Sequence, residues 1–107
     1  MKVTVYHNEN LFARYNDEKE VFTRVAVVEA PMGDVMEALE YAYRWTNNVM
    51  GSWSRTDIED NGDYNPDVTV MASLGEGGMG LRSTSMGDQM LIGNKKYKVA
   101  AFGFEEI

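Results

Sequence analysis

The stretch that decides the fold runs from residue 34 to residue 50 and has the sequence DVMEALEYAYRWTNNVM. Side chains that suit a core recur in it three or four positions apart: Val35, Ala38, Leu39, Ala42, Trp45, Thr46 and Val49. This spacing predicts an amphipathic helix. Asp34 followed by Glu37 resembles a capping box at its start, and Gly51 is a natural stop. We therefore expect one helix of about four turns near residues 34–50.

Short segments of strand-like sequence lie on both sides of this helix. Two precede it, at residues 3–7 and 21–30, and three follow it, at residues 68–72, 89–92 and 97–102. Alternating apolar positions and β-branched residues favour strands. The order β-β-α-β-β-β predicts an α+β fold, with the helix covering a small, mainly antiparallel sheet whose first two strands are neighbours. A partly closed barrel at the C-terminal end is the alternative arrangement.

Length and charge narrow the classes of protein. The chain has 107 residues, which predicts one domain over residues 1–107. Its 10 basic and 17 acidic residues give a net charge of −7, so we expect no direct binding to nucleic acid. Cysteine is absent, which excludes disulfides, thiolate catalysis and zinc-thiolate sites. With no signal-peptide pattern and no long apolar run, the expectation is a cytoplasmic protein of a bacterial host, away from membranes.

A long acidic connection, residues 52–67, separates the predicted helix from the next strand. It holds five carboxylates and one arginine, a local net charge of −4. Counted from Asp57, its spacing partly fits a calcium-binding EF-hand loop, but Val68 stands where the bidentate glutamate belongs. The prediction is therefore a solvated, mobile loop with no metal site.

A glycine pattern and a single histidine could indicate cofactor binding or catalysis, but each lacks the neighbouring residues that such a site requires. Gly75, Gly77 and Gly80 match the letters of a dinucleotide-binding turn, but no amphipathic helix follows them. His7 is the only histidine, and no serine in the chain stands in a nucleophile-elbow context. The sequence thus predicts a non-enzymatic protein without a cofactor.

Aromatic residues in the acidic connection suggest a contact surface. Exposed Trp and Tyr are favoured as anchors in protein interfaces. The predicted partner-binding residues are Trp53, Asp57, Glu59, Asp60, Asp63 and Tyr64. The alternative for Trp53 is that it folds back to cap the core.

A C-terminal pattern carries a resemblance. Residues 82–88 have the form R-S-x-S-x-G-D, followed by Y-x-V at 97–99 and G-F at 103–104. This layout resembles small uncharacterised proteins of actinobacteria and their phages, and more distantly YodL-like segments of mobile-element proteins. The resemblance covers about the last 75 residues, and Gln89-Met90 replaces the valine usual after the Gly-Asp pair. It implies a phage or mobile-element origin, with no established activity.

The leading hypothesis is a non-enzymatic, phage-type accessory protein that binds a host cytoplasmic protein and modulates or inhibits it. One alternative is an acidic nucleic-acid mimic that blocks a restriction or other DNA-acting enzyme. Another is a self-assembling structural or virion-associated protein. A third is hydrolysis assisted by a divalent metal at the loop between Asp57 and Asp67. Homodimerisation through an exposed sheet edge is compatible with each of these.

Overall fold

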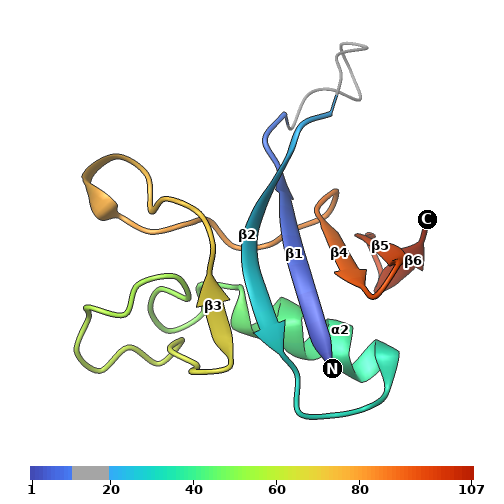
Figure 1. The fold of residues 1–107 in the computed structure, drawn as a ribbon. Helices are drawn as coiled ribbons and strands as arrows, with labels where there is room; N and C mark the ends of the chain where they lie inside the picture. The colour runs from blue at the N-terminus through green and yellow to red at the C-terminus, as the bar shows by residue number, and fades with distance from the viewer. Residues whose placement is uncertain (11–19) are drawn as a thin grey trace.

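One antiparallel sheet and one helix organise the chain in the computed structural model, which describes residues 1–10 and 20–107 (Figure 1). The sheet has six strands in the order β3-β2-β1-β4-β5-β6. The strands are β1 (Lys2–Asn8), β2 (Phe22–Glu29), β3 (Val68–Val70), β4 (Gln89–Ile92), β5 (Lys95–Val99) and β6 (Phe104–Glu106). The helix is α2 (Val35–Trp45), and a short 3-10 turn, η1, spans Glu76–Gly78. The α+β fold and the antiparallel pairing of the first two strands are confirmed.

A bulge in the central strand pair sets which side chains face the helix. Val5 pairs with Ala26, whereas Tyr6 pairs with Arg24, so that Val25 is an extra residue in β2. An extra residue shifts the alternation of the strand and increases its local twist. As a result both Val25 and Ala26 are buried, while Arg24 stays exposed.

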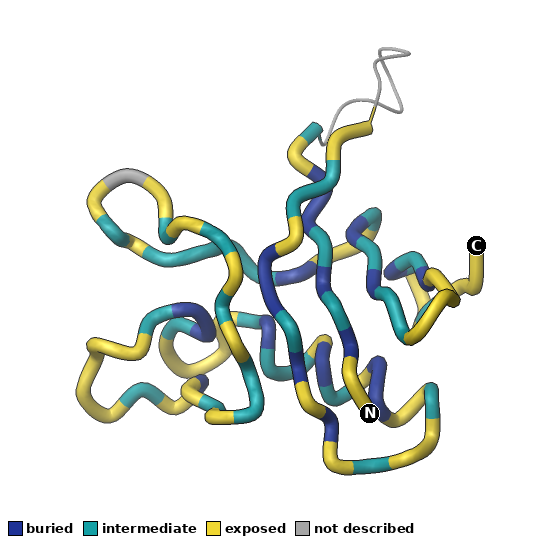
Figure 2. The backbone as a smooth tube through the Cα atoms, in the orientation of Figure 1, coloured by how far each residue is buried: buried dark blue, intermediate teal, exposed yellow. Residues whose placement is uncertain are grey.

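The core lies between the sheet and α2. Figure 2 shows buried positions alternating with less buried ones along β1 and β2. The buried apolar residues are Val3, Val5, Val25, Ala26, Val28, Ala30, Ala38, Leu39, Ala42, Trp53, Met90, Tyr97 and Val99. Full burial of side chains such as Leu39 stabilises the fold by about 1.5–3 kcal/mol each. The helix covers only one face of the sheet, so the outward side chains stay accessible.

Helix α2 begins as predicted and ends earlier. At its start, Asp34 Oδ2 accepts a hydrogen bond from the backbone N–H of Glu37 at 3.0 Å. It ends at Trp45 because the Thr46 hydroxyl donates to the Ala42 carbonyl at 2.7 Å and the Asn47 amide donates to the Tyr43 carbonyl. The backbone N–H of Thr46 also donates to both carbonyls, so side chains and the last helical N–H share the acceptors at this end.

Two side chains that the helical spacing assigned to the apolar face lie outside the core. Val49 lies outside the helix and is 62 % exposed. Trp45 is half-buried, and the Arg44 guanidinium lies over its ring at 4.1 Å from the centroid. Trp45 is therefore a cation–π partner at the margin of the core.

The C-terminal end of the sheet contains a strand that the sequence did not predict. The chain turns at Gly103, whose φ is +74°, and the N–H of Ala100 donates to the Gly103 carbonyl. Phe104 then pairs with Val99 to form β6. The described strands do not close into a barrel: β3 and β6 are the two edges, each three residues long. No helix in the described part of the chain has the length and apolar character needed to cross a membrane.

Candidate functional site

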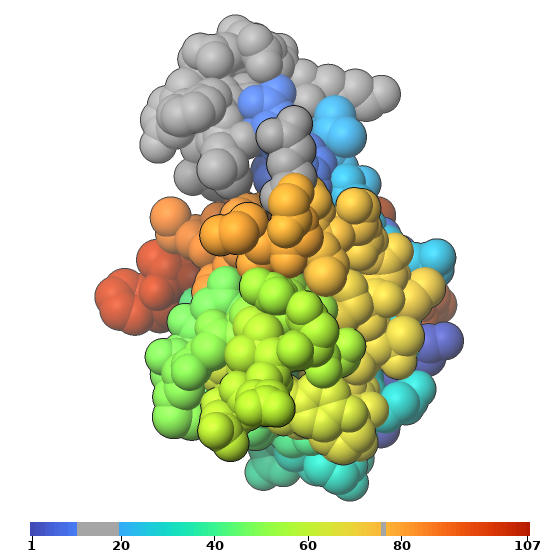
Figure 3. Space-filling view, turned by 90° about the vertical axis from the view of Figure 1, so that its left-hand side faces the viewer, coloured from blue at the N-terminus to red at the C-terminus, as the bar shows by residue number. Residues whose placement is uncertain are grey.

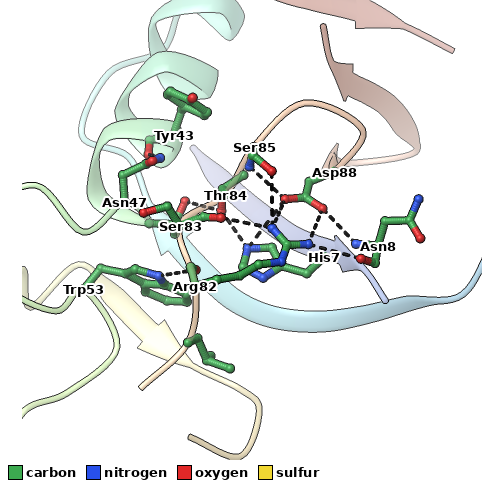
Figure 4. Close-up of polar contacts among 12 residues, drawn as sticks. His7, Asn8, Tyr43, Asn47, Trp53, Arg82, Ser83, Thr84, Ser85 and Asp88 are labelled. Carbon is green, nitrogen blue, oxygen red and sulfur yellow. Dashed lines mark hydrogen bonds and ion pairs between the residues drawn. The ribbon is translucent and has the colours of Figure 1, made fainter. Parts of the chain in front are cut away.

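The R-S-x-S-x-G-D pattern forms an ion pair between a half-buried arginine and a buried aspartate (Figure 4). Arg82 donates two hydrogen bonds to the Asp88 carboxylate, from Nη1 to Oδ2 at 2.7 Å and from Nη2 to Oδ1 at 2.8 Å. The same carboxylate accepts the backbone N–H of Ser85 and that of Asn8, each at 2.8 Å. Because Asp88 is completely buried, these four donors replace its water. The pattern therefore joins segment 82–88 to the end of β1.

A chain of hydroxyl groups runs from His7 to α2 beside this ion pair. Thr46 donates to the Ala42 carbonyl, and Thr84 donates to the Thr46 hydroxyl at 2.8 Å. Since the one hydroxyl hydrogen of Thr84 is used, the 2.8 Å contact to His7 requires Nε2 of His7 to donate. Burial lowers the pKa of His7 from 6.5 to about 4, despite the nearby Asp88 carboxylate. His7 is thus neutral near pH 7 and carries its hydrogen on Nε2.

The grouping of Thr84, His7 and Asp88 differs from a catalytic triad in geometry. A triad uses both ring nitrogens, one toward the nucleophile and one toward the acid. Here Nε2 of His7 contacts the Thr84 hydroxyl and also lies 3.9 Å from Asp88 Oδ2. All three side chains are buried, and the threonine hydroxyl donates away from the histidine. The arrangement holds segment 82–88, β1 and α2 together.

Trp53 belongs to the interior. It is 3 % exposed, its Nε1 donates to the Arg82 carbonyl at 2.9 Å, and its ring meets His7 edge-on with centroids 6.2 Å apart. Asn48 Oδ1 accepts the backbone N–H of Trp53. The alternative in which Trp53 caps the core is therefore the one observed, and Trp53 is not available as an exposed anchor.

Asp63 is the second predicted contact residue that lies inside. It is completely buried, and its Oδ2 accepts the N–H groups of Val49, Met50 and Gly51 at 2.7–2.9 Å. Its Oδ1 lies 3.2 Å from Nη2 of Arg44. Burial alone would raise the pKa of Asp63, but the backbone donors and Arg44 outweigh burial and hold it below its ordinary value. Asp63 therefore organises the turn after α2 and does not face a partner.

The remaining predicted contact residues are exposed. Figure 3 looks onto their side of the molecule, where segment 50–67 is drawn from green to yellow. Its side chains Asp57, Ile58, Glu59, Asp60 and Tyr64 are exposed, and we call them the acidic loop surface. A shallow hollow of about 280 Å³ opens among Ile58, Asp60 and Tyr64.

Hydrogen bonds within residues 52–61 connect the backbone beneath the acidic loop surface, and the mobility that the sequence suggested for this loop stays a prediction. Asn61 donates to the carbonyls of Ser52 and Arg55 at 2.7 and 2.8 Å, and its Oδ1 accepts the N–H of Ser52. Arg55 pairs with Asp57, and this contact lowers the pKa of the Asp57 carboxyl. Of the exposed carboxylates, Asp57 is thus held by Arg55, while Glu59 and Asp60 face solvent.

The described residues contain no group of three or more His, Cys, Asp or Glu side chains that could hold a metal ion. The EF-hand alignment from Asp57 fails for a physical reason: Arg55 holds Asp57 and backbone amides hold Asp63. At the glycine pattern, Gly75, Gly77 and Gly80 all have positive φ and lead into irregular chain, so no helix N-terminus faces a phosphate.

Comparison with protein-family models, curated proteins and solved structures finds no match for this chain. The case for function therefore rests on the geometry of the fold and its surfaces.

Sequence reasoning missed two exposed apolar residues beside the acidic loop surface. Val49 and Met50 are 62 % and 68 % exposed. Helical spacing assigned Val49 to the core, and the helix ends before it. The signal that could have placed it outside is Thr46-Asn47-Asn48, three residues that hydrogen-bond to backbone and favour helix ends.

Proposed function

We propose that the protein is a small binding module that contacts another protein through the acidic loop surface. It acts by blocking the site that it covers on this partner, without chemical catalysis. The observation that supports this most is the exposure of Asp57, Glu59 and Asp60 on one segment, whose backbone Asn61 ties together through the carbonyls of Ser52 and Arg55. A preorganised loop loses little conformational entropy when it binds. Exposed Ile58 and Tyr64 lie among the carboxylates and offer the apolar centre that an interface needs.

The partner that fits this surface carries basic side chains around an apolar patch. Electrostatic complementarity of that kind raises association rates and selects the partner. In line with the sequence-based hypothesis, the proposed partner is a cytoplasmic protein of a bacterial host, which a phage-type accessory protein would modulate or inhibit.

The mimic hypothesis is the weaker candidate on this surface. Of the five carboxylates in residues 52–67, Asp63 is buried and Asp67 accepts a hydrogen bond from the Tyr41 hydroxyl at 2.6 Å. Only three remain exposed, and one of these is paired with Arg55. Imitation of a phosphate backbone needs a longer row of free negative charges.

The test compares partner capture from a bacterial host lysate by the wild-type protein and by two charge variants. The loop variant carries Asp57→Lys, Glu59→Lys and Asp60→Asn. Asparagine is used at residue 60 because Asp60 has a φ of +53°, which asparagine tolerates. The control variant carries Glu37→Lys, Glu40→Lys and Glu106→Gln, the same change in charge on exposed positions elsewhere.

We expect one protein to be retained in stoichiometric amount by the wild type and the control but lost by the loop variant. If both variants retain equally less of the captured protein, the effect depends on net charge alone, and the assignment of the acidic loop surface is overturned. Tyr64→Ala then separates the two kinds of contact: it weakens a mixed apolar and acidic interface and leaves a purely electrostatic one unchanged. Elution at low salt with Tyr64→Ala neutral would favour the mimic.

A further inference from the structure

The face of the sheet opposite α2 has its own set of side chains. In Figure 1 the helix lies behind β1 and β2, and no described segment passes in front of them. Strand pairing places outward side chains in two rows across the strands. One row is Arg24, Tyr6, Gln89 and Lys98, and the other is Val27, Thr4, Leu91 and Lys96. From β2 to β5 each row spans about 14 Å, given the usual separation of neighbouring strands.

The free cations of the described chain gather on this face. Elsewhere, three arginines contact carboxylates (Arg44, Arg55 and Arg82), and Lys95 lies 4.0 Å from Glu106. Within residues 1–10 and 20–107, the cations without an ion pair are Lys2, Arg24, Lys96 and Lys98, all at outward positions of the sheet. Glu29 and Glu105 are the acids at outward register positions. In the strand register Glu29 pairs with Lys2 and Glu105 with Lys98, and Glu20 contacts Asn8 at the end of β1. With four cations against three acids, the face keeps a small positive excess in a chain whose net charge is −7.

Two hollows lie on this face and share Leu91. The first, of about 200 Å³, is lined by Tyr6, Phe22, Gln89, Met90, Leu91 and Lys96. The second, of about 440 Å³, is lined by Lys2, Thr4, Leu91, Ile92 and Gly93. Each hollow thus combines an apolar floor with one lysine, and the first adds two aromatic rings.

We infer that this surface, which we call the basic sheet face (Lys2, Tyr6, Phe22, Arg24, Lys96 and Lys98), binds single-stranded nucleic acid. Nucleobases stack on aromatic side chains whatever their sequence, while lysine and arginine neutralise the phosphates. Here Tyr6 and Phe22 supply the rings, and the four cations flank them. The basic sheet face shares no residue with the acidic loop surface, so this inference stands apart from the proposed protein partner.

The net charge gave the opposite expectation because it averages over the whole surface. Exposed charges further apart than about 8–10 Å are largely screened at physiological salt, so a bound strand responds to the local cations. A second copy of the chain packed face to face would bring the same four cations together, which is unfavourable. An acidic partner protein would satisfy the cations but leave the aromatic hollow without a planar occupant.

The experiment measures fluorescence anisotropy of a labelled single-stranded oligo(dT) of about 12 nucleotides over a series of salt concentrations. Lys96→Glu with Lys98→Glu should reduce affinity at least about tenfold and flatten the salt dependence. Tyr6→Ala should reduce affinity roughly 5- to 100-fold at every salt concentration, and Tyr6→Phe should keep it, since the ring is what stacks.

The matched control is Lys95→Glu, which lies on the same strand at an alternate position. It should change affinity much less than Lys96→Glu alone, which makes the same change in charge on the basic sheet face. Thermal melts of all variants report whether they fold. Absence of binding by the wild type, or equal losses from Lys95→Glu and the Lys96/Lys98 variant, would overturn the inference. Binding of a folded acidic peptide in preference to oligo(dT), or concentration-dependent self-association that blocks it, would assign the face to a protein instead.

Discussion

Asp63 and Asp88 are both completely buried carboxylates beside an arginine, and the structure holds them in different ways. Asp88 is held by a side chain, through two hydrogen bonds from the Arg82 guanidinium. Asp63 is held mainly by backbone, through three consecutive N–H groups after α2. The first joins distant segments of the chain, whereas the second shapes one loop.

This difference determines how much of the protein is destabilised when each carboxylate is removed. A side-chain ion pair between sequence-distant segments supports the core globally, since Arg82 and Asp88 also bond to Asn8 at the end of β1. A carboxylate that caps one turn supports mainly the residues that it binds. Loss of Asp88 should therefore destabilise the whole fold, and loss of Asp63 should open the loop alone.

The largest effect should come from Asp88→Ala. It removes the acceptor of two backbone N–H groups and the partner of the half-buried Arg82, so we expect a loss of about 3–5 kcal/mol in the free energy of unfolding. Urea titration followed by circular dichroism measures this loss. The double variant Arg82→Met/Asp88→Ala should be less destabilised than the sum of its single changes. A loss below about 1 kcal/mol would place the pair with ordinary surface ion pairs.

The next effect is the pH dependence of stability, which differs between His7, beside Asp88, and Asp63. Because burial lowers the pKa of His7 to about 4, the unfolded chain takes up a proton there at higher pH than the folded chain does. Stability from His7 is therefore complete above about pH 6.5 and is lost as pH falls toward 4, by about 3 kcal/mol in all. Asp63, whose pKa is lowered, loses its contribution only below the ordinary carboxyl range.

Urea titrations at several pH values would test this order. His7→Gln keeps a donor toward Thr84 but cannot titrate, so its stability should change far less than that of the wild type between pH 6.5 and 4. Identical slopes for the two proteins in that interval would contradict the buried, neutral state of His7.

The smallest effect should be that of Asp63→Asn. Asparagine retains an acceptor oxygen but loses the charge that strengthens three hydrogen bonds, so we expect a loss of about 1–2 kcal/mol. Amide hydrogen exchange should speed up at Val49, Met50 and Gly51 and stay unchanged in β1. Asp60→Asn, on the exposed side of the same loop, is the control and should leave those amides protected. Uniform acceleration across the sheet would mean that Asp63 supports the whole fold.

Local patterns in the sequence predicted the elements well and their ends less well. The helix start at Asp34 follows from a capping residue, a local signal. Its end at Trp45 depends on side chains that bond to carbonyls, where the apolar spacing suggested that the helix continues to Val49. Strand β6 escaped prediction because it is three residues long, includes two glutamates and forms only by pairing with β5.

The candidate site was harder to predict, because burial depends on contacts between distant residues. Trp53 and Asp63 stand in a polar stretch that gives no local sign of burial. Trp53 is buried by Arg82 and His7, and neither lies near it in sequence. By contrast, Asp57, Glu59, Asp60 and Tyr64 are exposed, as their polar surroundings indicate. Whether they bind a partner stays a prediction.

The short edges of the sheet bear on how the protein behaves in concentrated solution. β3 and β6 expose only three residues of unpaired backbone each, and β6 carries Glu105 and Glu106. Long, uncharged edge strands invite other chains to add to a sheet and seed aggregates, whereas short or charged edges resist such growth. The protein leaves one face of its sheet uncovered, but its two edge strands offer little unpaired backbone to which another chain could add. We therefore expect it to resist growth into fibrils along the hydrogen-bonding direction of the sheet.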